Sequence, residues 1–181
     1  MLYGEREVNM NYRTKTYIAA DWDHDGDAVE QLYKWKNGKG WSLDFSDAHE
    51  LTQSIDSSLP CSIKASLKTR MDASKKFVLI VGEHTNTVTK GGCQFCNSYN
   101  HYIRYCAKGK TVDTRSFIKY ECDKAYEAGI KIIVLYKDVK VNREKCPAVI
   151  RYIGEHVPMI YIGNDGKRYW NYDAVKKALE A

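Results

Sequence analysis

The chain has 181 residues, of which 44% are hydrophobic and 28% are charged. This length and balance suit one globular domain and exclude two large ones. The net charge of +5 favours an anionic ligand. The chain has no basic stripe of the kind that nucleic-acid-binding proteins carry. No apolar run reaches the about 18 residues that cross a bilayer, and residues 1–13 lack the apolar region of a signal peptide. We therefore expect a cytoplasmic protein with no membrane partner, whose six cysteines stay reduced or bind metal.

Short apolar strands alternate with amphipathic helices along the chain. Residues 1–14 are polar and predict an N-terminal arm before a single domain over 15–181. Strands are expected at 16–20, 41–45, 77–81, 130–135 and 158–162. Helices are expected at about 27–36, from 60, from 113 or 114 to 128, within 147–153 and from 171. Residues 86–112 are long for a connection and predict an insertion.

This alternation predicts an α/β fold whose central sheet is mainly parallel, because parallel strands need helical crossovers. Helices on both faces then give a flavodoxin-like three-layer sandwich around a five-stranded sheet. In such sheets the functional loops lie at the carboxyl ends of the strands.

One carboxylate interrupts the apolar stripe of the helix expected at 113–128. Glu121 falls near the middle of the face that carries Ile118, Cys122 and Ala125. A buried carboxylate must be paired, protonated or open to a cleft, because burying an isolated charge is costly. Periodicity leaves two interpretations open: a structural glutamate with a partner, or a catalytic carboxylate at the mouth of the sheet. Cys122, beside it, points toward the core and is interpreted as packing.

The segment Phe-Ile-Lys-Tyr-Glu-Cys at 117–122, followed by Gly129 and an aliphatic strand, resembles the Trp-x-x-x-Glu region of TIR domains. It is most similar to bacterial TIR-like proteins, including the TIR subunits of Thoeris anti-phage systems, and the likeness spans most of 15–135. The resemblance implies that Glu121 is the catalytic residue for cleaving NAD. Phe117 stands where the family has Trp, a departure that bears on the shape of the pocket more than on the chemistry.

The same resemblance implies substrate-binding residues. In TIR proteins that cleave NAD, the loops after the first two strands border the nucleotide, and here they hold Asp21, Trp22, Phe45 and Ser46. Phe117 belongs to the motif itself. Thr85, just after the 77–81 strand, is expected close to the site. Capping and turn chemistry is the alternative, and it alone explains Asp25, Asp27 and Asp47 of these loops. No Gly-rich phosphate fingerprint supports NAD independently.

Four side chains in the insertion have metal-ligand spacing. Cys93, Cys96, His101 and Cys106 follow Cys-x2-Cys-x4-His-x4-Cys, the ligand spacing of a zinc knuckle, and predict a structural zinc beside the site. The glycines usual in a knuckle are replaced, and TIR domains do not generally carry this insertion. The alternative is a reduced, tyrosine-rich loop with buried thiols.

The resemblance implies a signalling protein that cleaves NAD at the nicotinamide–ribose bond, with no cofactor needed for catalysis. The product would be ADP-ribose or a cyclic ADP-ribose isomer. The protein would be a homo-oligomer, and its partner would be an effector protein that responds to the nucleotide in anti-phage defence. A non-catalytic TIR-like or receiver-like module is the alternative, although a receiver needs an Asp where Val81 is followed by Gly82 and Glu83. A nucleoside deoxyribosyltransferase, also flavodoxin-like and Glu-dependent, is a third interpretation.

Overall fold

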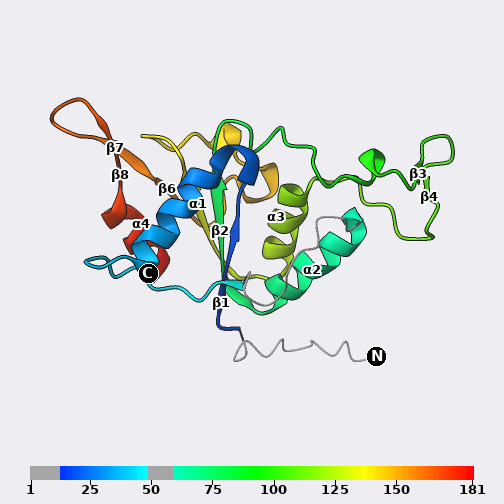
Figure 1. The fold of residues 1–181 in the computed structure, drawn as a ribbon, viewed down its shortest axis with the longest axis horizontal. Coiled ribbons are helices and arrows are strands. Elements are labelled where there is room, and N and C mark those ends of the chain that lie inside the picture. Colours follow the sequence, from blue (N-terminus) through cyan, green and yellow to red (C-terminus); the bar gives the residue numbers. More distant parts are fainter. Residues whose placement is uncertain (1–12, 49–58) are drawn as a thin grey trace.

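A parallel sheet forms the centre of the molecule. The computed structural model describes residues 13–48 and 59–181 (Figure 1). Within them, the main sheet has the order β1 (Lys15–Ala19), β2 (Ser74–Val81), β5 (Lys131–Tyr136) and β6 (Glu155–Pro158), with every neighbouring pair parallel. This confirms the α/β class and is compatible with a flavodoxin-like, TIR-like fold.

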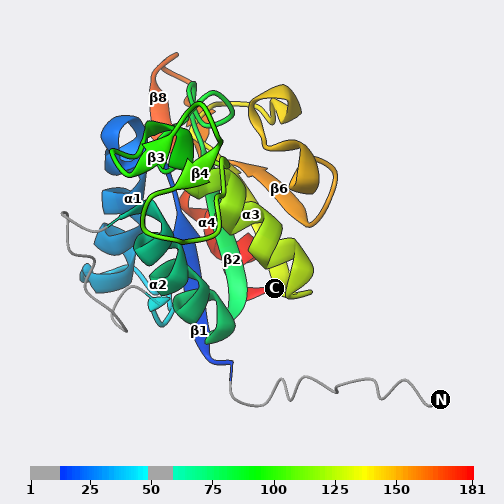
Figure 2. The same ribbon diagram turned by 90° about the vertical axis from the view of Figure 1, so that its right-hand side faces the viewer.

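Two helix layers cover the two faces of this sheet (Figures 1 and 2). Helices α2 (Pro60–Asp72) and α3 (Phe117–Glu127) pack on one face, and α1 (Trp22–Asn37) and α4 (Tyr172–Glu180) pack on the other. Successive strand residues point to opposite faces, so the sheet supplies two cores. Tyr17 and Phe77 belong to the core under α2 and α3, whereas Ile18 and Val78 belong to the core under α1 and α4.

The strand predicted at 41–45 does not form. Its alternating pattern has another cause, because Leu43 and Phe45 are buried in the core beside α1 while Asp44 between them is exposed. The backbone meets the sheet only at 46–47, where the Thr16 N–H donates to the Ser46 carbonyl and Asp47 bridges to Thr16. Four strands rather than five therefore make up the main sheet in the described residues. The predicted 1–14 arm and the loop that follows residue 46 fall largely outside those residues.

Helix α1 begins five residues earlier than predicted. The acidic stretch 21–27, expected to be a loop, is the cap and first turns of the helix. Asp21 is the N-cap and its side chain accepts from the Asp23 N–H at 3.3 Å. Acidic side chains in the first turn are favoured because they face the positive end of the helix dipole. The helix ends at Gly38, as predicted.

The cap of α3 also differs from the prediction. Ser116, and neither Asp113 nor Thr114, caps the helix, with its hydroxyl accepting from the Lys119 N–H at 3.2 Å. Asp113 is bound instead to the Arg115 guanidinium, at 2.7 Å. Past the C-terminus, Gly129 has φ +61, a left-handed conformation that suits a glycine after a helix.

The last sheet strand lies earlier than predicted. Strand β6 is Glu155–Pro158, and the predicted 158–162 stretch largely forms β7 (Ile160–Ile162), which pairs with β8 (Arg168–Trp170). This separate hairpin turns through 164–166, as expected, and α4 follows with Asn171 as its predicted cap. Short 3-10 turns, η4 (Arg143–Lys145) and η5 (Ala148–Ile150), precede β6.

The connection from β2 to α3 extends away from the sheet on one side (Figure 1). It contains a 3-10 turn, η3 (Cys93–Phe95), and a two-stranded hairpin, β3 (Tyr99–Asn100) and β4 (Tyr105–Cys106). Among the described residues, no helix is long and apolar enough to cross a membrane.

Candidate active site

A pocket of about 340 Å³ opens beyond the carboxyl end of β1. Its walls come from the start of α1, the inner sides of α2 and α3, and residues 88–90 of the connection after β2. The carboxyl ends of parallel strands are where open α/β sheets bind ligands. The pocket brings together four residues that the sequence predicted for the site: Asp21, Trp22, Phe117 and Glu121.

Glu121 lies at the inner end of this pocket, and its residue is 7% exposed. The Tyr17 hydroxyl donates a hydrogen bond to Glu121 Oε1 at 2.6 Å. Burial raises the pKa of Glu121 to about 7, against the opposing effects of the Tyr17 hydrogen bond and the charge of Arg70. The structural interpretation of Glu121 has support because its carboxylate has partners. The catalytic interpretation has support because the carboxylate also faces a pocket. A pKa near neutrality lets it change charge in the range where an enzyme works.

Tyr17 and Arg70 are site residues that sequence reasoning missed. Tyr17 is fully buried in β1, and its pKa is raised well above the ordinary value by burial and by Glu121, so it remains a hydrogen-bond donor. Arg70 is 5% exposed on α2 and lines the pocket beside Glu121. The signal that could have found Arg70 is its place three residues after the inward-facing Leu67, on the same face of the helix.

Two aromatic side chains line the pocket. Trp22 is half exposed at the start of α1, and Phe117 begins α3. The Phe117 ring lies directly against Gly91, where an added Cβ would be 2.5 Å from the ring, and the Phe117 N–H donates to the Lys90 carbonyl at 2.9 Å. Gly91 has φ +99, which a side-chain-bearing residue rarely adopts. The connection after β2 therefore fixes the position of the Phe117 ring.

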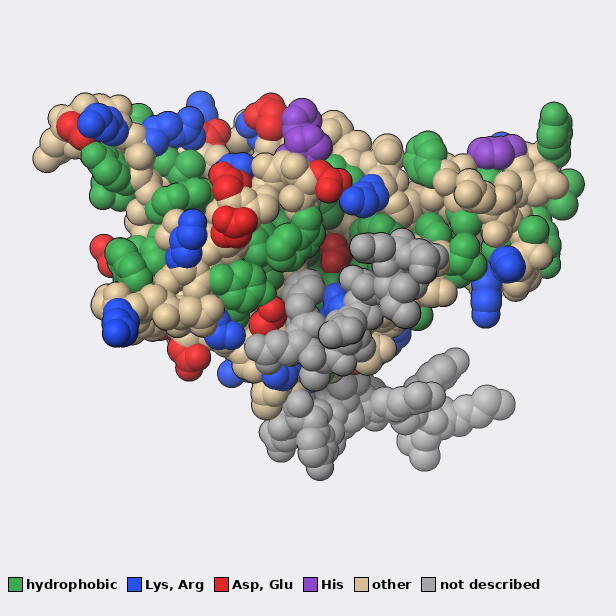
Figure 3. Space-filling view, viewed as in Figure 1, with side chains coloured by type: hydrophobic (Ala, Val, Ile, Leu, Met, Phe, Trp, Pro, Cys, Tyr) green, Lys and Arg blue, Asp and Glu red, His purple; other side chains and the backbone are tan. Residues whose placement is uncertain are grey.

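Charged groups surround the mouth of the pocket. Lys90 Nζ pairs with Asp23 Oδ2 at 2.9 Å, and both side chains are exposed, so this ion pair is easily opened. Asp21 is buried, and besides capping α1 it contacts the His24 ring nitrogen Nδ1 at 2.7 Å. Its capping role thus coexists with its place in the wall. Figure 3 shows acidic and basic side chains close together on this face of the molecule.

The other three predicted substrate-binding residues lie elsewhere. Phe45 is buried in the core beside α1, with Lys36 Nζ 4.9 Å from its ring centre. Ser46 is exposed at the edge of the sheet. Thr85 is buried after β2, where its hydroxyl accepts from the Gly82 N–H at 2.9 Å and shapes the turn. None of the three is part of the pocket lining around Glu121.

The cysteines of the insertion also come together, but without His101. Cys93, Cys96 and Cys106 line one small cavity, which a fourth thiol, Cys61 of α2, completes. His101 is exposed and its ring meets that of Tyr99 edge-on, with centroids 4.9 Å apart. Within residues 13–48 and 59–181, no three Cys, His, Asp or Glu side chains are already arranged to hold a metal ion.

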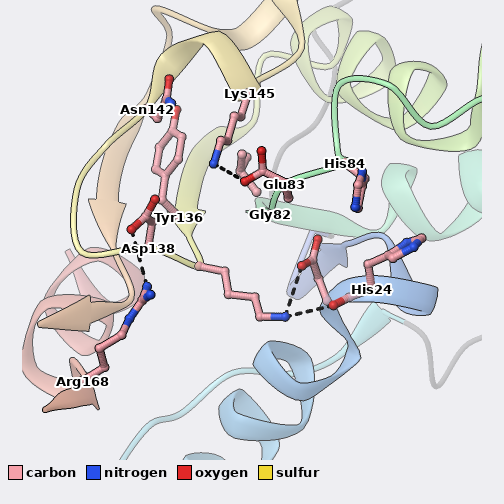
Figure 4. A pocket seen from close by; sticks show the side chains of 12 residues that line it. His24, Gly82, Glu83, His84, Tyr136, Asp138, Asn142, Lys145 and Arg168 are labelled. Atoms are coloured by element: carbon pink, nitrogen blue, oxygen red, sulfur yellow. Dashed lines mark hydrogen bonds and ion pairs between the residues drawn. The ribbon is translucent and has the colours of Figure 1, made fainter.

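A second pocket of about 340 Å³ lies at the carboxyl ends of β2 and β5 (Figure 4). Its cations are held by neighbouring carboxylates: Lys137 by Asp27 at 2.6 Å and Lys145 by Glu83 at 2.5 Å. Asp25 is buried here, and burial raises its pKa, although Lys137 opposes the shift. This lining also has rings, those of Tyr136, His24 and His84, but its buried carboxylate Asp25 is paired with Lys137. The Glu121 pocket combines a nearly buried carboxylate with the rings of Trp22 and Phe117, so it is the better candidate.

Residues 17–90 match the family described as Thoeris protein ThsB, TIR-like domain. The matched region includes Tyr17 and the pocket residues Trp22, Arg70 and Lys90, and it ends before Glu121. No curated protein matches the chain. The match covers less than half of the chain, and it supports the TIR-like family to which the sequence resemblance pointed.

Proposed function

We propose that this protein cleaves NAD at the nicotinamide–ribose bond. The proposal starts from the match of residues 17–90 to the TIR-like domain of the Thoeris ThsB type, a family of defence-related signalling proteins. Glu121 is the proposed catalytic carboxylate. The observation that carries the proposal is the position of Glu121: it is nearly buried, it faces an aromatic-walled pocket, and its pKa is about 7.

The chemistry needs a negative charge beside the ribose. As the bond to nicotinamide breaks, its electron pair leaves with the ring nitrogen, and positive charge develops on the ribose as an oxocarbenium-like centre. A carboxylate in a poorly solvated pocket stabilises that charge strongly, because water screens it little. Nicotinamide leaves as a neutral molecule, so no strong general acid is required. Ionised Glu121 can supply this stabilisation alone.

Several groups of the pocket suit a dinucleotide. Trp22 and Phe117 offer ring surfaces on which nicotinamide can stack, and a pocket of about 340 Å³ is in the range that holds small ligands. Lys90, whose ion pair with Asp23 is exposed, can turn to an anionic phosphate. Tyr17 and Arg70 act on Glu121 rather than on substrate, since both favour its ionised form.

Two products are compatible with this chemistry. Attack of water on the ribose gives ADP-ribose and releases a proton, whereas attack by another nucleophile of the same nucleotide gives a cyclic isomer. We propose the cyclic product, as a signal for an effector protein in anti-phage defence, together with a homo-oligomer in which self-association supports activity. Mass spectrometry of the product and the molar mass in solution at increasing protein concentration test these two points.

A non-catalytic signalling module is the second candidate, and one observation favours it. Glu121 is already hydrogen-bonded to Tyr17 and close enough to Arg70 for its charge to be felt. A structural carboxylate would show the same contacts. Such a protein would bind a nucleotide or a partner without cleaving NAD.

Nicotinamide release by the purified full-length chain separates these functions. The assay uses concentrated protein with a crowding agent, and compares the wild type with Glu121→Gln and Glu127→Gln. Glu127 is the matched control, since it lies on the exposed side of the same helix. Release by the wild type and Glu127→Gln, but not by Glu121→Gln, supports the proposal. A deoxynucleoside that exchanges its base while NAD stays intact would instead identify a deoxyribosyltransferase.

A further inference from the structure

Four of the six cysteines of the chain converge on one small cavity. They come from three separate segments: Cys61 from the first turn of α2, Cys93 and Cys96 from the two ends of the η3 turn, and Cys106 from β4. Cys93 and Cys106 are buried, and all four are free thiols. The remaining two cysteines lie in the core under α3. The fold therefore places Cys61 beside three cysteines that are distant from it in the sequence.

The insertion has almost no hydrophobic core. Over 86–112, the buried residues are Gly92, Cys93 and Cys106, so the buried side chains of this stretch are two thiols. Its large apolar side chains face solvent: Tyr102 is 99% exposed and Ile103 68% exposed. Figure 3 shows hydrophobic side chains at the end of the molecule where β3 and β4 lie in Figure 1. A projecting segment with so little buried apolar surface needs a cross-link or a metal to hold one conformation.

Backbone hydrogen bonds fix the position of two of the thiols beside the cavity. The Asp113 N–H donates to Cys93 Sγ at 3.3 Å, and the Cys96 N–H donates to the Cys93 carbonyl at 2.9 Å, closing a tight turn between the two thiols. Cys61 lies next to Pro60 at the positive end of α2. That end has no side-chain cap and no acidic residue in its first turn.

We propose that Cys61, Cys93, Cys96 and Cys106 bind one structural Zn²⁺ ion, with His101 outside the ligand set. Four thiolates are a closed ligand set for structural zinc, and binding would release the thiol protons to solvent. Because no three ligating side chains among the described residues are yet arranged around a common point, the thiols must rotate inward when the ion binds. The ion would join the insertion to α2, which also forms a wall of the Glu121 pocket.

The test is metal analysis of the full-length protein, purified with reductant and without chelator. The wild type and His101→Gln should each contain about one zinc ion per chain, whereas Cys61→Ser should lose most of it. His101 is exposed, so its substitution should leave the fold intact. Zinc that depends on His101 and not on Cys61 would overturn the proposed ligand set, and wild-type protein without zinc would overturn the site itself.

Cobalt substitution keeps the test decisive if Cys61→Ser does not fold. The thiolate-to-cobalt charge-transfer band grows with the number of thiolate ligands, so the wild type and His101→Gln should give equal bands of tetrathiolate intensity. A weaker band in His101→Gln, or an intensity in the wild type typical of three thiolates, contradicts the assignment. Wild-type protein in which these cysteines form disulfides, counted by thiol titration after denaturation without reductant, contradicts it as well.

Discussion

Glu121 combines two properties that seldom occur together, near-complete burial and an opening to a pocket. Its neighbours Tyr17 and Arg70 hold back the increase in pKa that burial causes. The carboxylate is thus near its midpoint at neutral pH. This residue-scale balance makes both the stability and the proposed activity of the protein sensitive to pH.

The stability of the folded chain should fall as pH rises toward neutrality. Glu121 has a pKa of about 7 when folded and 4.5 ordinarily, so between these values the folded chain binds a proton that the unfolded chain has lost. The difference corresponds to about 3 kcal/mol. We predict that Glu121→Gln, which keeps an oxygen for Tyr17 but no charge, removes this slope. Urea unfolding at pH 5 and pH 8 measures it, and parallel pH profiles for the two proteins would contradict the assignment.

Tyr17→Phe tests how the carboxylate is kept ionised. The Tyr17 hydrogen bond lowers the pKa of Glu121, so its loss raises that pKa and moves the ionisation to higher pH. A hydrogen bond to a charged group contributes about 1.5–3 kcal/mol, which corresponds to about one pH unit or more. We predict that nicotinamide release falls about tenfold at pH 7 and recovers at pH 9. An unchanged pH profile would show that the hydroxyl has no such role.

At the scale of elements, the helix ends position the site. Ser116 caps the N-terminus of α3 and thereby fixes where this helix begins. The start of the helix in turn sets the position of Glu121, which lies five residues after the cap. We predict that Ser116→Ala lowers the free energy of unfolding by about 1 kcal/mol, because one N–H of the first turn loses its acceptor. Thr114→Ala is the control, since Thr114 is exposed and does not cap the helix, and should change little. Chemical denaturation compares the two, and equal losses would point to another cause.

Hydrophobic periodicity predicted helices α1 to α4, strands β1, β2 and β5 and the place of Glu121 on α3, because those signals arise from burial on one face. It misplaced the last sheet strand, and the helix expected within 147–153 is only a 3-10 turn. It failed at 41–45, where Leu43 and Phe45 alternate for packing without backbone pairing. The expected ligand role of Phe45 assumed that strand. Tyr17 and Arg70 were missed because a pattern tells which way a side chain points and not which group it meets. Cys61 was missed for the same reason, since only the fold brings it to Cys93.

At the scale of the whole molecule, the insertion depends on the site that we propose at the four cysteines. If zinc holds residues 86–112, a chelator should leave the sheet folded and loosen the insertion alone. We predict that trypsin then cuts at the exposed Arg104, Lys108 and Lys110 at least tenfold faster, while the rest of the chain resists. Mass spectrometry of the early fragments measures this. Equal cleavage with and without chelator would show that metal does not hold the insertion.

Glu121 joins the pocket to the proposed chemistry, so the most direct measurement is nicotinamide release from NAD by the full-length wild type and Glu121→Gln. We predict that the wild type releases nicotinamide and that the substitution lowers the rate about a hundredfold or more, with Glu127→Gln unaffected. The wild-type rate should also rise with pH through about 7, as Glu121 ionises. Release that survives in Glu121→Gln would contradict its catalytic role, and no release from concentrated wild-type protein would contradict the proposed NAD cleavage.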